Sequence, residues 1–133
     1  MAYIKYKELT KYFNFNAEIP MDNLPKYVND FVNSDETLIG AYKTSRDKGI
    51  FTDKKMILFD LPPLTDEKKI HIIPYSSISS GAIVFNSSSA EILLSLDSGY
   101  QMRLDFVRLG AEEKTRLRII FTEMLTKADK KNK

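Results

Sequence analysis

Residues 38–78 constrain the fold of this chain more than any other stretch of it. Two apolar runs, residues 38–42 and 56–60, flank a polar string at residues 45–55. Runs of this length between turn residues are typical of β-strands joined by hairpins. The stretch holds no combination of residues that would form a nucleophile, a metal-binding cluster or a phosphate-binding loop. It therefore predicts a small antiparallel sheet and says little about chemistry.

Seven strands followed by one helix are predicted from residue 36 onward. The last strand is the clearest, because Tyr100, Met102, Leu104 and Phe106 alternate with polar residues, as expected when one face of a strand is buried. After Gly110 the apolar residues recur at helical spacing, which predicts a C-terminal amphipathic helix. The strands are expected near residues 37–44, 48–52, 55–60, 69–73, 80–85, 91–96 and 100–107. The fold class is thus mainly β with helices.

Helical spacing of apolar residues characterises the N-terminal part of the chain. Residues 3–13 are expected to form a short exposed helix, and Asp22 or Asn23 to cap a second helix that stops at residues 33–35. These apolar residues either pack on the sheet or form a docking surface for another subunit. The docking surface would consist of Tyr3, Tyr6, Leu9, Tyr12, Phe13 and Phe15. The predicted organisation is an N-terminal helical extension at residues 1–35, one domain at residues 36–128 and a basic disordered tail at residues 129–133.

The composition is ordinary for a single globular domain. The 133 residues are 43% hydrophobic and 29% charged, with a formal net charge of +2, so no strong field attracts nucleic acid. The aromatic residues are not interleaved with the basic ones, which also argues against nucleic acid as a partner. The chain has no cysteine, no secretion signal and no run of about 18 apolar residues that would form a transmembrane segment. We therefore expect a cytoplasmic location.

The sequence contains no recognisable catalytic or metal-binding constellation. His71 is the only histidine and cysteine is absent, so a zinc site or a nucleophilic triad would lack its partners. The carboxylates are scattered over turns, and the five glycines form no nucleotide-binding motif. We expect a protein that is not an enzyme and that uses no metal or cofactor.

Two segments of the chain resemble the bacterial pleckstrin-homology-like family, the bacterial PH domain. The first begins with Tyr42-Lys43-Thr44-Ser45-Arg46-Asp47 and continues through residues 50–60. The second is Ile73-Pro74-Tyr75-Ser76-Ser77-Ile78. The resemblance implies a PH-like seven-stranded antiparallel barrel or sandwich capped by a C-terminal α-helix, over residues 36–128. It also implies a non-enzymatic scaffold module whose members frequently associate into closed rings, with no known catalytic residues. Structural roles in the hairpins are expected for Arg46, Asp47, Phe51 and Thr52, with direct ligand contact as the alternative.

Three functions are compatible with these expectations. The first is a protein-interaction and oligomerisation module that presents a sheet edge or the N-terminal extension to protein partners, copies of itself included. The second is a peripheral binder of anionic lipid or of a phosphorylated small ligand, through a basic hairpin rim. The third is a small accessory or phage-type inhibitor of a host protein. The residues of the basic rim would be Lys43, Arg46, Lys48, Lys54 and Lys55.

Overall fold

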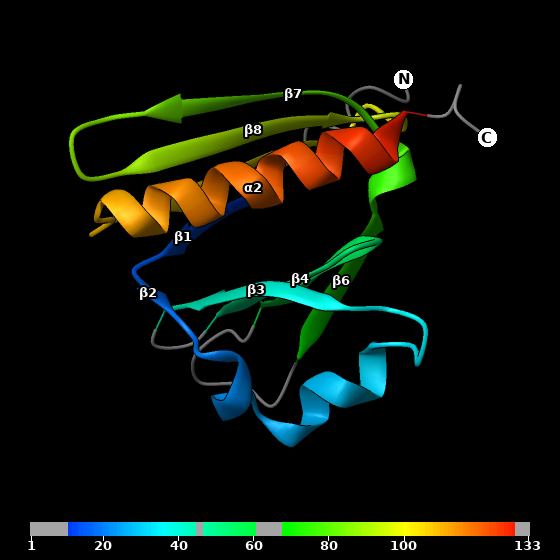
Figure 1. The fold of residues 1–133 in the computed structure, drawn as a ribbon. Helices are drawn as coiled ribbons and strands as arrows, with labels where there is room; N and C mark the ends of the chain where they lie inside the picture. Colours follow the sequence, from blue (N-terminus) through cyan, green and yellow to red (C-terminus); the bar gives the residue numbers. More distant parts are fainter. Residues whose placement is uncertain (1–10, 45–46, 61–67, 130–133) are drawn as a thin grey trace.

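Two β-sheets and one long helix make up the described part of the molecule (Figure 1). The structure, a computed structural model, describes residues 11–44, 47–60 and 68–129. The first elements are β1 (Lys11–Phe15), β2 (Ala17–Glu18) and the 3-10 helices η1 (Met21–Asn23) and η2 (Lys26–Phe31). They are followed by β3 (Leu38–Lys43), β4 (Lys48–Thr52), β5 (Lys55–Asp60), β6 (Lys69–Pro74), the 3-10 helix η3 (Tyr75–Ser77), β7 (Ile78–Phe85), β8 (Ala90–Leu96), β9 (Gln101–Phe106) and α2 (Ala111–Ala128).

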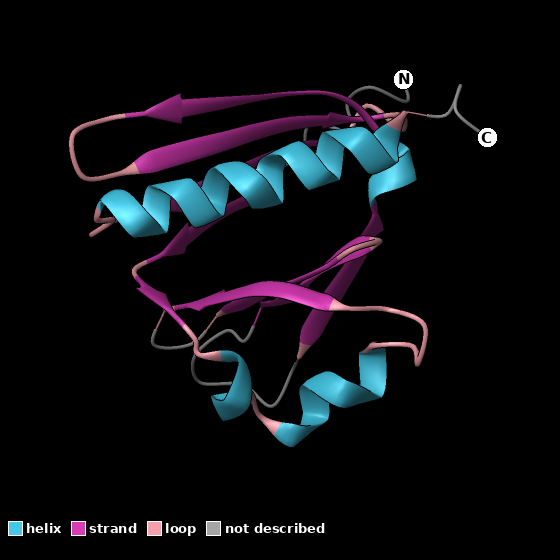
Figure 2. Cartoon of the chain, in the orientation of Figure 1, coloured by secondary structure: helices cyan, strands magenta, loops and turns pink. Residues whose placement is uncertain are grey.

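The strands form a four-stranded sheet and a five-stranded sheet that are packed into a sandwich (Figure 2). The four-stranded sheet has the order β1-β9-β8-β7, with β1 parallel to β9 and the other pairs antiparallel. The five-stranded sheet has the order β2-β3-β4-β5-β6 and is antiparallel throughout. The chain crosses between the sheets at Asn16, between β1 and β2, and again at η3. The predicted PH-like sandwich with a C-terminal helix is therefore confirmed, and the described strands do not close into a barrel.

The main hydrophobic core fills the space between the two sheets. Aromatic rings meet there: the ring centroids of Phe15 and Phe106 are 5.4 Å apart, and those of Tyr42 and Phe106 are 4.9 Å apart. A second, smaller cluster lies where η2 covers the five-stranded sheet, with Val28 of η2 and Phe59 of β5 both buried. The two faces of β5 are thus both covered, which explains its uninterrupted apolar sequence.

The helix α2 is amphipathic and packs on one side of the sandwich (Figure 1). Leu117, Ile120 and Met124 are buried, at the spacing of one helical face. At its N-terminus the Gly110 N–H donates a hydrogen bond of 2.7 Å to Oε1 of Glu113, so this carboxylate caps the helix. None of the helices in the described ranges combines the length and the apolar character that crossing a bilayer requires.

The seven predicted strands are confirmed as β3 to β9, and the main error lies at the N-terminus. The helix predicted at residues 3–13 is wrong for residues 11–13, which belong to β1, while residues 3–10 lie outside the described residues. The helical extension predicted at residues 1–35 is likewise wrong for residues 11–15 and 17–18, which form one strand of each sheet. The reason is that the edge of β9 offers backbone groups that β1 can pair with, while Phe15 enters the core. The second predicted helix is present as the short helices η1 and η2.

Candidate functional site

The described residues of the predicted basic rim lie at two separate places. Lys43 and Lys48 are opposite each other in the register of β3 and β4, whereas Lys54 and Lys55 follow at the other end of β4. Arg46 lies outside the described residues. The ammonium group of Lys48 is 5.9 Å from the centre of the Tyr27 ring, in a cation–π arrangement. Among the described residues of the rim, the structure therefore places Lys43 beside Lys48 and separates this pair from Lys54 and Lys55.

The other two basic residues are held in ion pairs. Lys54 Nζ is 2.7 Å from Oδ2 of Asp35, and this hydrogen bond lowers the pKa of the Asp35 carboxyl and raises that of Lys54. Lys55 Nζ is 3.0 Å from Oε1 of Glu36, whose side chain is almost completely buried. Because carboxylates neutralise them, Lys54 and Lys55 contribute little positive potential to a basic rim.

Among the described residues, the structure places the side chain of only one member of the predicted aromatic docking surface, Phe15. Tyr3, Tyr6 and Leu9 lie outside these residues, and the backbone of Tyr12 and Phe13 belongs to β1. The prediction that Phe15 contributes to an interaction surface is wrong, because its side chain is 1% exposed and packs in the main core. Burial in the core is the more favourable outcome for an aromatic side chain at a strand end.

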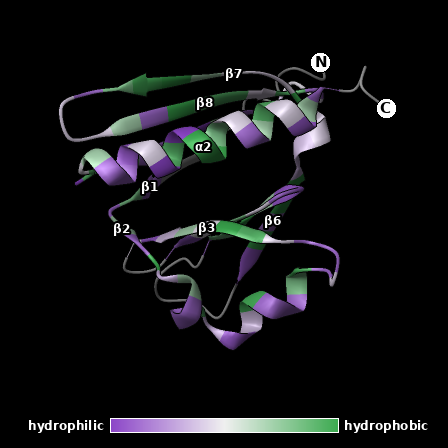
Figure 3. Cartoon of the chain, viewed as in Figure 1, coloured by the Kyte–Doolittle hydropathy of each residue, from purple (hydrophilic) through white to green (hydrophobic). Residues whose placement is uncertain are grey.

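The exposed edge of β7 is the most distinctive surface of the molecule. β7 pairs with β8 on one side, and no other strand of the described residues pairs with its second side. Its eight residues include no charged residue and no proline, and Val84 and Phe85 at its end are 42% and 40% exposed. Figure 3 shows this half of β7 as hydrophobic. Edge strands are normally protected by charges, prolines or cover, so a long uncharged edge is a template for pairing with another strand.

One side of α2 flanks β7 along its length, and the two elements run in opposite directions (Figure 1). At one end, Lys114 Nζ donates to the carbonyl oxygens of Asn86 and Ser87, at 2.6 and 2.7 Å. At the other end, a Cβ atom on Gly81 would lie 3.3 Å from both Phe121 and Leu125, so the helix approaches the strand closely there. We define the β7 edge surface as β7 together with these flanking α2 residues: Lys114, Arg118, Phe121 and Leu125.

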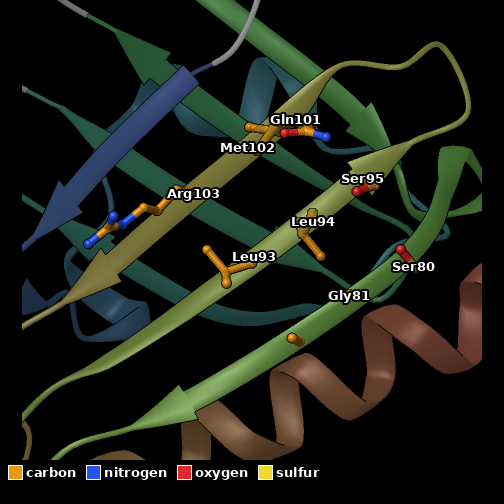
Figure 4. A pocket seen from close by; sticks show the side chains of 9 residues that line it. Ser80, Gly81, Leu93, Leu94, Ser95, Gln101, Met102 and Arg103 are labelled. Atoms are coloured by element: carbon orange, nitrogen blue, oxygen red, sulfur yellow. The ribbon is translucent and has the colours of Figure 1, made fainter.

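A shallow pocket of about 390 Å³ lies beside this edge, over β7, β8 and β9 (Figure 4). The small residues Ser80 and Ala82 of β7 line it, and Leu93 of β8 is a large apolar lining residue that is 37% exposed. Arg103 also lines it, and its Nε is 2.9 Å from Oδ1 of Asp105. A strand added to β7 would therefore have room for bulky side chains over this pocket.

A buried polar group lies at the opposite end of the core. Tyr42 is 2% exposed, and its hydroxyl has no hydrogen-bond partner among the described residues. Burial raises the pKa of the Tyr42 hydroxyl, and the Glu18 carboxylate nearby raises it further. The cavity beside it measures about 10 Å³, close to the minimum that holds one water molecule. A site of this size does not accommodate an organic ligand.

Comparison with known proteins decides the family. The family model described as "Bacterial PH domain" matches residues 9–98, more than half of the chain. The chain belongs to the bacterial PH domain family. The match contains all of β7 and β8 and ends before β9 and α2. The β7 edge surface of this bacterial PH domain is thus built partly from residues beyond the matched segment.

Solved structures of other bacterial PH domains share the fold. A DUF1696 family protein with a pleckstrin-homology domain from Shewanella loihica is 25% identical, with a TM-score of 0.65, and the alignment covers 84% of this chain and 96% of that one. A pleckstrin homology domain from Shewanella amazonensis is 27% identical, with a TM-score of 0.51 and coverages of 77% and 89%. A PH-domain-containing protein from Exiguobacterium sibiricum is 16% identical, with a TM-score of 0.66 and coverages of 90% and 64%. None of the curated proteins matches the chain.

The two segments that resemble the family meet in a buried hydrogen-bond network of this bacterial PH domain. The Tyr75 hydroxyl donates to the Thr52 carbonyl oxygen at 2.8 Å, and the Tyr75 N–H donates to the Lys54 carbonyl oxygen at 3.0 Å. The Thr52 hydroxyl, which is fully buried, is 2.9 Å from Oε2 of Glu36. These contacts join the end of β4, the turn after it and η3 to the segment before β3, which supports the structural interpretation of Thr52.

The sequence contained one sign of the β7 edge that we did not single out. We expected a strand at residues 80–85, and residues 78–85 carry no charge and no proline. The position of α2 beside this strand could not be seen, because it depends on how elements far apart in the sequence pack together.

Proposed function

We propose that this bacterial PH domain is a non-enzymatic protein-interaction module that accepts an extended segment of a partner protein at the edge of β7. The observation that carries this proposal is the uncharged, eight-residue edge strand, which lacks a second pairing strand in the described residues. An added strand would form backbone hydrogen bonds with β7 and place alternate side chains over the pocket of Figure 4. Inhibition of a host protein, the third function considered above, would use the same surface. The absence of cysteine agrees with action in the cytoplasm.

We also propose that copies of the chain associate with one another through β6, the last strand of the five-stranded sheet. Like β7, β6 has no second neighbour among the described strands. Ile70 and Ile72 on it are 37% and 44% exposed, next to the covered apolar face of β5. Exposed apolar residues beside an open edge favour association of two like surfaces.

Anionic ligand binding receives less support than protein interaction. The ion pairs of Lys54 and Lys55 reduce the charge available to a phosphate, which leaves Lys43 and Lys48 as the neighbouring pair among the described rim residues. A salt-dependent binding of the chain to anionic lipid vesicles, lost on substitution of Lys43 and Lys48 together, would favour this alternative instead.

Three matched lysine substitutions test the two edges. Val84→Lys places a charge on the β7 edge, Ile72→Lys on the β6 edge, and Ile119→Lys on the solvent side of α2, where the residue is 55% exposed. In size-exclusion chromatography with light scattering, we expect the unsubstituted chain to exceed its monomer mass of 15.3 kDa and Ile72→Lys alone to approach it. In a pull-down from the native host, we expect Val84→Lys alone to lose partners that the other two variants retain. A chain that stays monomeric at high concentration contradicts self-association, and an identical set of partners for all three variants contradicts the role of β7.

A further inference from the structure

The flanking side of α2 gives the β7 edge surface a positive charge. Arg118 lies one helical turn after Lys114 and two turns before Leu125, on the same side of the helix. Lys114 is bound to the hairpin after β7 and Leu125 lies against Gly81, so Arg118 lies beside the strand between these two contacts. β7 itself contributes no charge.

Arg118 is exposed and forms no ion pair within the described ranges. The residues three and four positions away from it along α2 are Lys114, Thr115, Phe121 and Thr122, none of which is acidic. The nearest acidic residue on this side of the helix is Asp129, three turns further along. Glu91, on the neighbouring strand β8, is engaged by Arg103 at 3.3 Å. The guanidinium of Arg118 therefore remains available to a carboxylate of another molecule.

The two faces of an added strand would meet different surroundings. Gly81 and Ile83 of β7 face the core and α2, whereas Ser80 and Ala82 line the outer pocket. Since side chains of a strand alternate between faces, every second residue of an added strand would point toward α2 and the others toward the pocket. The first set would meet Arg118, and the second set would meet small residues and Leu93.

We propose that the occupant of the β7 edge surface is an extended acidic segment of another protein, with carboxylates on the face toward Arg118 and bulky uncharged side chains on the face toward the pocket. This inference rests on the proposed function of the β7 edge and specifies its partner. A second copy of β7 in this place would be less favourable, because it is uncharged and would bring two cationic helix sides together.

Two fluorescein-labelled peptides of about nine residues, the length that spans β7, serve as probes. One alternates tyrosine with glutamate and the other alternates tyrosine with lysine. By fluorescence anisotropy, we expect the full chain to bind the glutamate peptide about threefold to tenfold more tightly than the lysine peptide. Arg118→Glu is expected to reverse this order, and Arg118→Gln to bind both peptides alike. Lys43→Glu, which makes the same change of net charge on the other sheet, is expected to keep the order of the unsubstituted chain.

The outcomes separate this inference from the proposed function. Equal binding of both peptides, lost in Val84→Lys, overturns the acidic preference and leaves the β7 edge as an interaction site. The role of Arg118 is also overturned if Arg118→Glu still binds the glutamate peptide more tightly than the lysine peptide. It is overturned as well if Lys43→Glu reverses this order of affinities to the same extent as Arg118→Glu. Binding of neither peptide overturns both proposals. Circular dichroism of each variant verifies that it is folded.

Discussion

Replacement of Tyr75 and of Tyr42 by phenylalanine removes the same group from two buried sites that differ in hydrogen bonding. Tyr75 is 0% exposed and donates to the Thr52 carbonyl at 2.8 Å, whereas Tyr42 is 2% exposed and its hydroxyl has no partner in the described residues. Loss of the donor leaves the buried Thr52 carbonyl with one hydrogen bond fewer, which costs about 1–2 kcal/mol. Removal of an unpaired buried hydroxyl relieves a desolvation cost, so its effect should lie between zero and about 1 kcal/mol of stabilisation.

Urea denaturation at equilibrium measures both effects. We expect Tyr75→Phe to lower the free energy of unfolding by about 1–2 kcal/mol and the melting temperature by about 2–8 °C. Tyr42→Phe is expected to leave the free energy of unfolding unchanged or to raise it. The dependence of this free energy on urea concentration should be the same in both variants, since the substitutions do not alter the surface exposed on unfolding. If both variants lost the same free energy of unfolding, the Tyr75–Thr52 hydrogen bond would not be what distinguishes the two sites.

Two further predictions concern the carboxylate of Glu36 and the close approach at Gly81. Burial alone would raise the pKa of Glu36, but hydrogen bonds from the Asn33 N–H, Lys55 and Thr52 hold it below its ordinary value of 4.5. Its stabilisation is therefore present above about pH 4.5 and is lost as the pH falls through the folded-state pKa. Glu36→Gln should lower the free energy of unfolding by about 1–3 kcal/mol at neutral pH. In urea titrations, the difference between this variant and the unsubstituted chain should shrink as the pH falls. A difference that does not depend on pH would contradict the role of the Glu36 carboxylate. A Cβ atom on Gly81 would lie 3.0 Å from Leu94 of β8 and 3.3 Å from Leu125 of α2, so Gly81→Val should lower the free energy of unfolding by about 1–3 kcal/mol in the same assay. The same substitution at the neighbouring exposed residue, Ala82→Val, should cost less than about 0.5 kcal/mol. Equal costs would contradict the close packing of β8 and α2 around Gly81.

Strands β3 to β9 and α2 were predictable because their signals are local. Alternation in Tyr100 to Phe106 and the helical spacing after Gly110 each reflect one buried face, and the elements follow the sequence pattern closely. β1 could not be predicted in this way. Its parallel pairing with β9 joins Lys11 to Met102, which lie far apart in the sequence, and no local pattern reports such a contact.

The candidate site was only partly visible in the sequence. The basic residues from Lys43 to Lys55 are close in sequence, but β4 separates them into two places, and the partners Asp35 and Glu36 come from the segment before β3. Proximity along the chain therefore overstated their proximity in space. The uncharged sequence of β7 was visible, whereas its status as an edge depends on the order of strands in the sheet.

The parallel pairing of β1 with β9 has a consequence for biosynthesis. Because Lys11 of β1 pairs with Met102 of β9, β1 is made well before the strand that completes its hydrogen bonds. The Val107 N–H, just after β9, then donates to the Phe15 carbonyl at 3.0 Å and fastens the junction of the two sheets. We therefore expect the β3–β6 hairpins to form first and the four-stranded sheet to form later, in a slower step dominated by long-range contacts. During that interval the unpaired β1 segment is a natural target for chaperones.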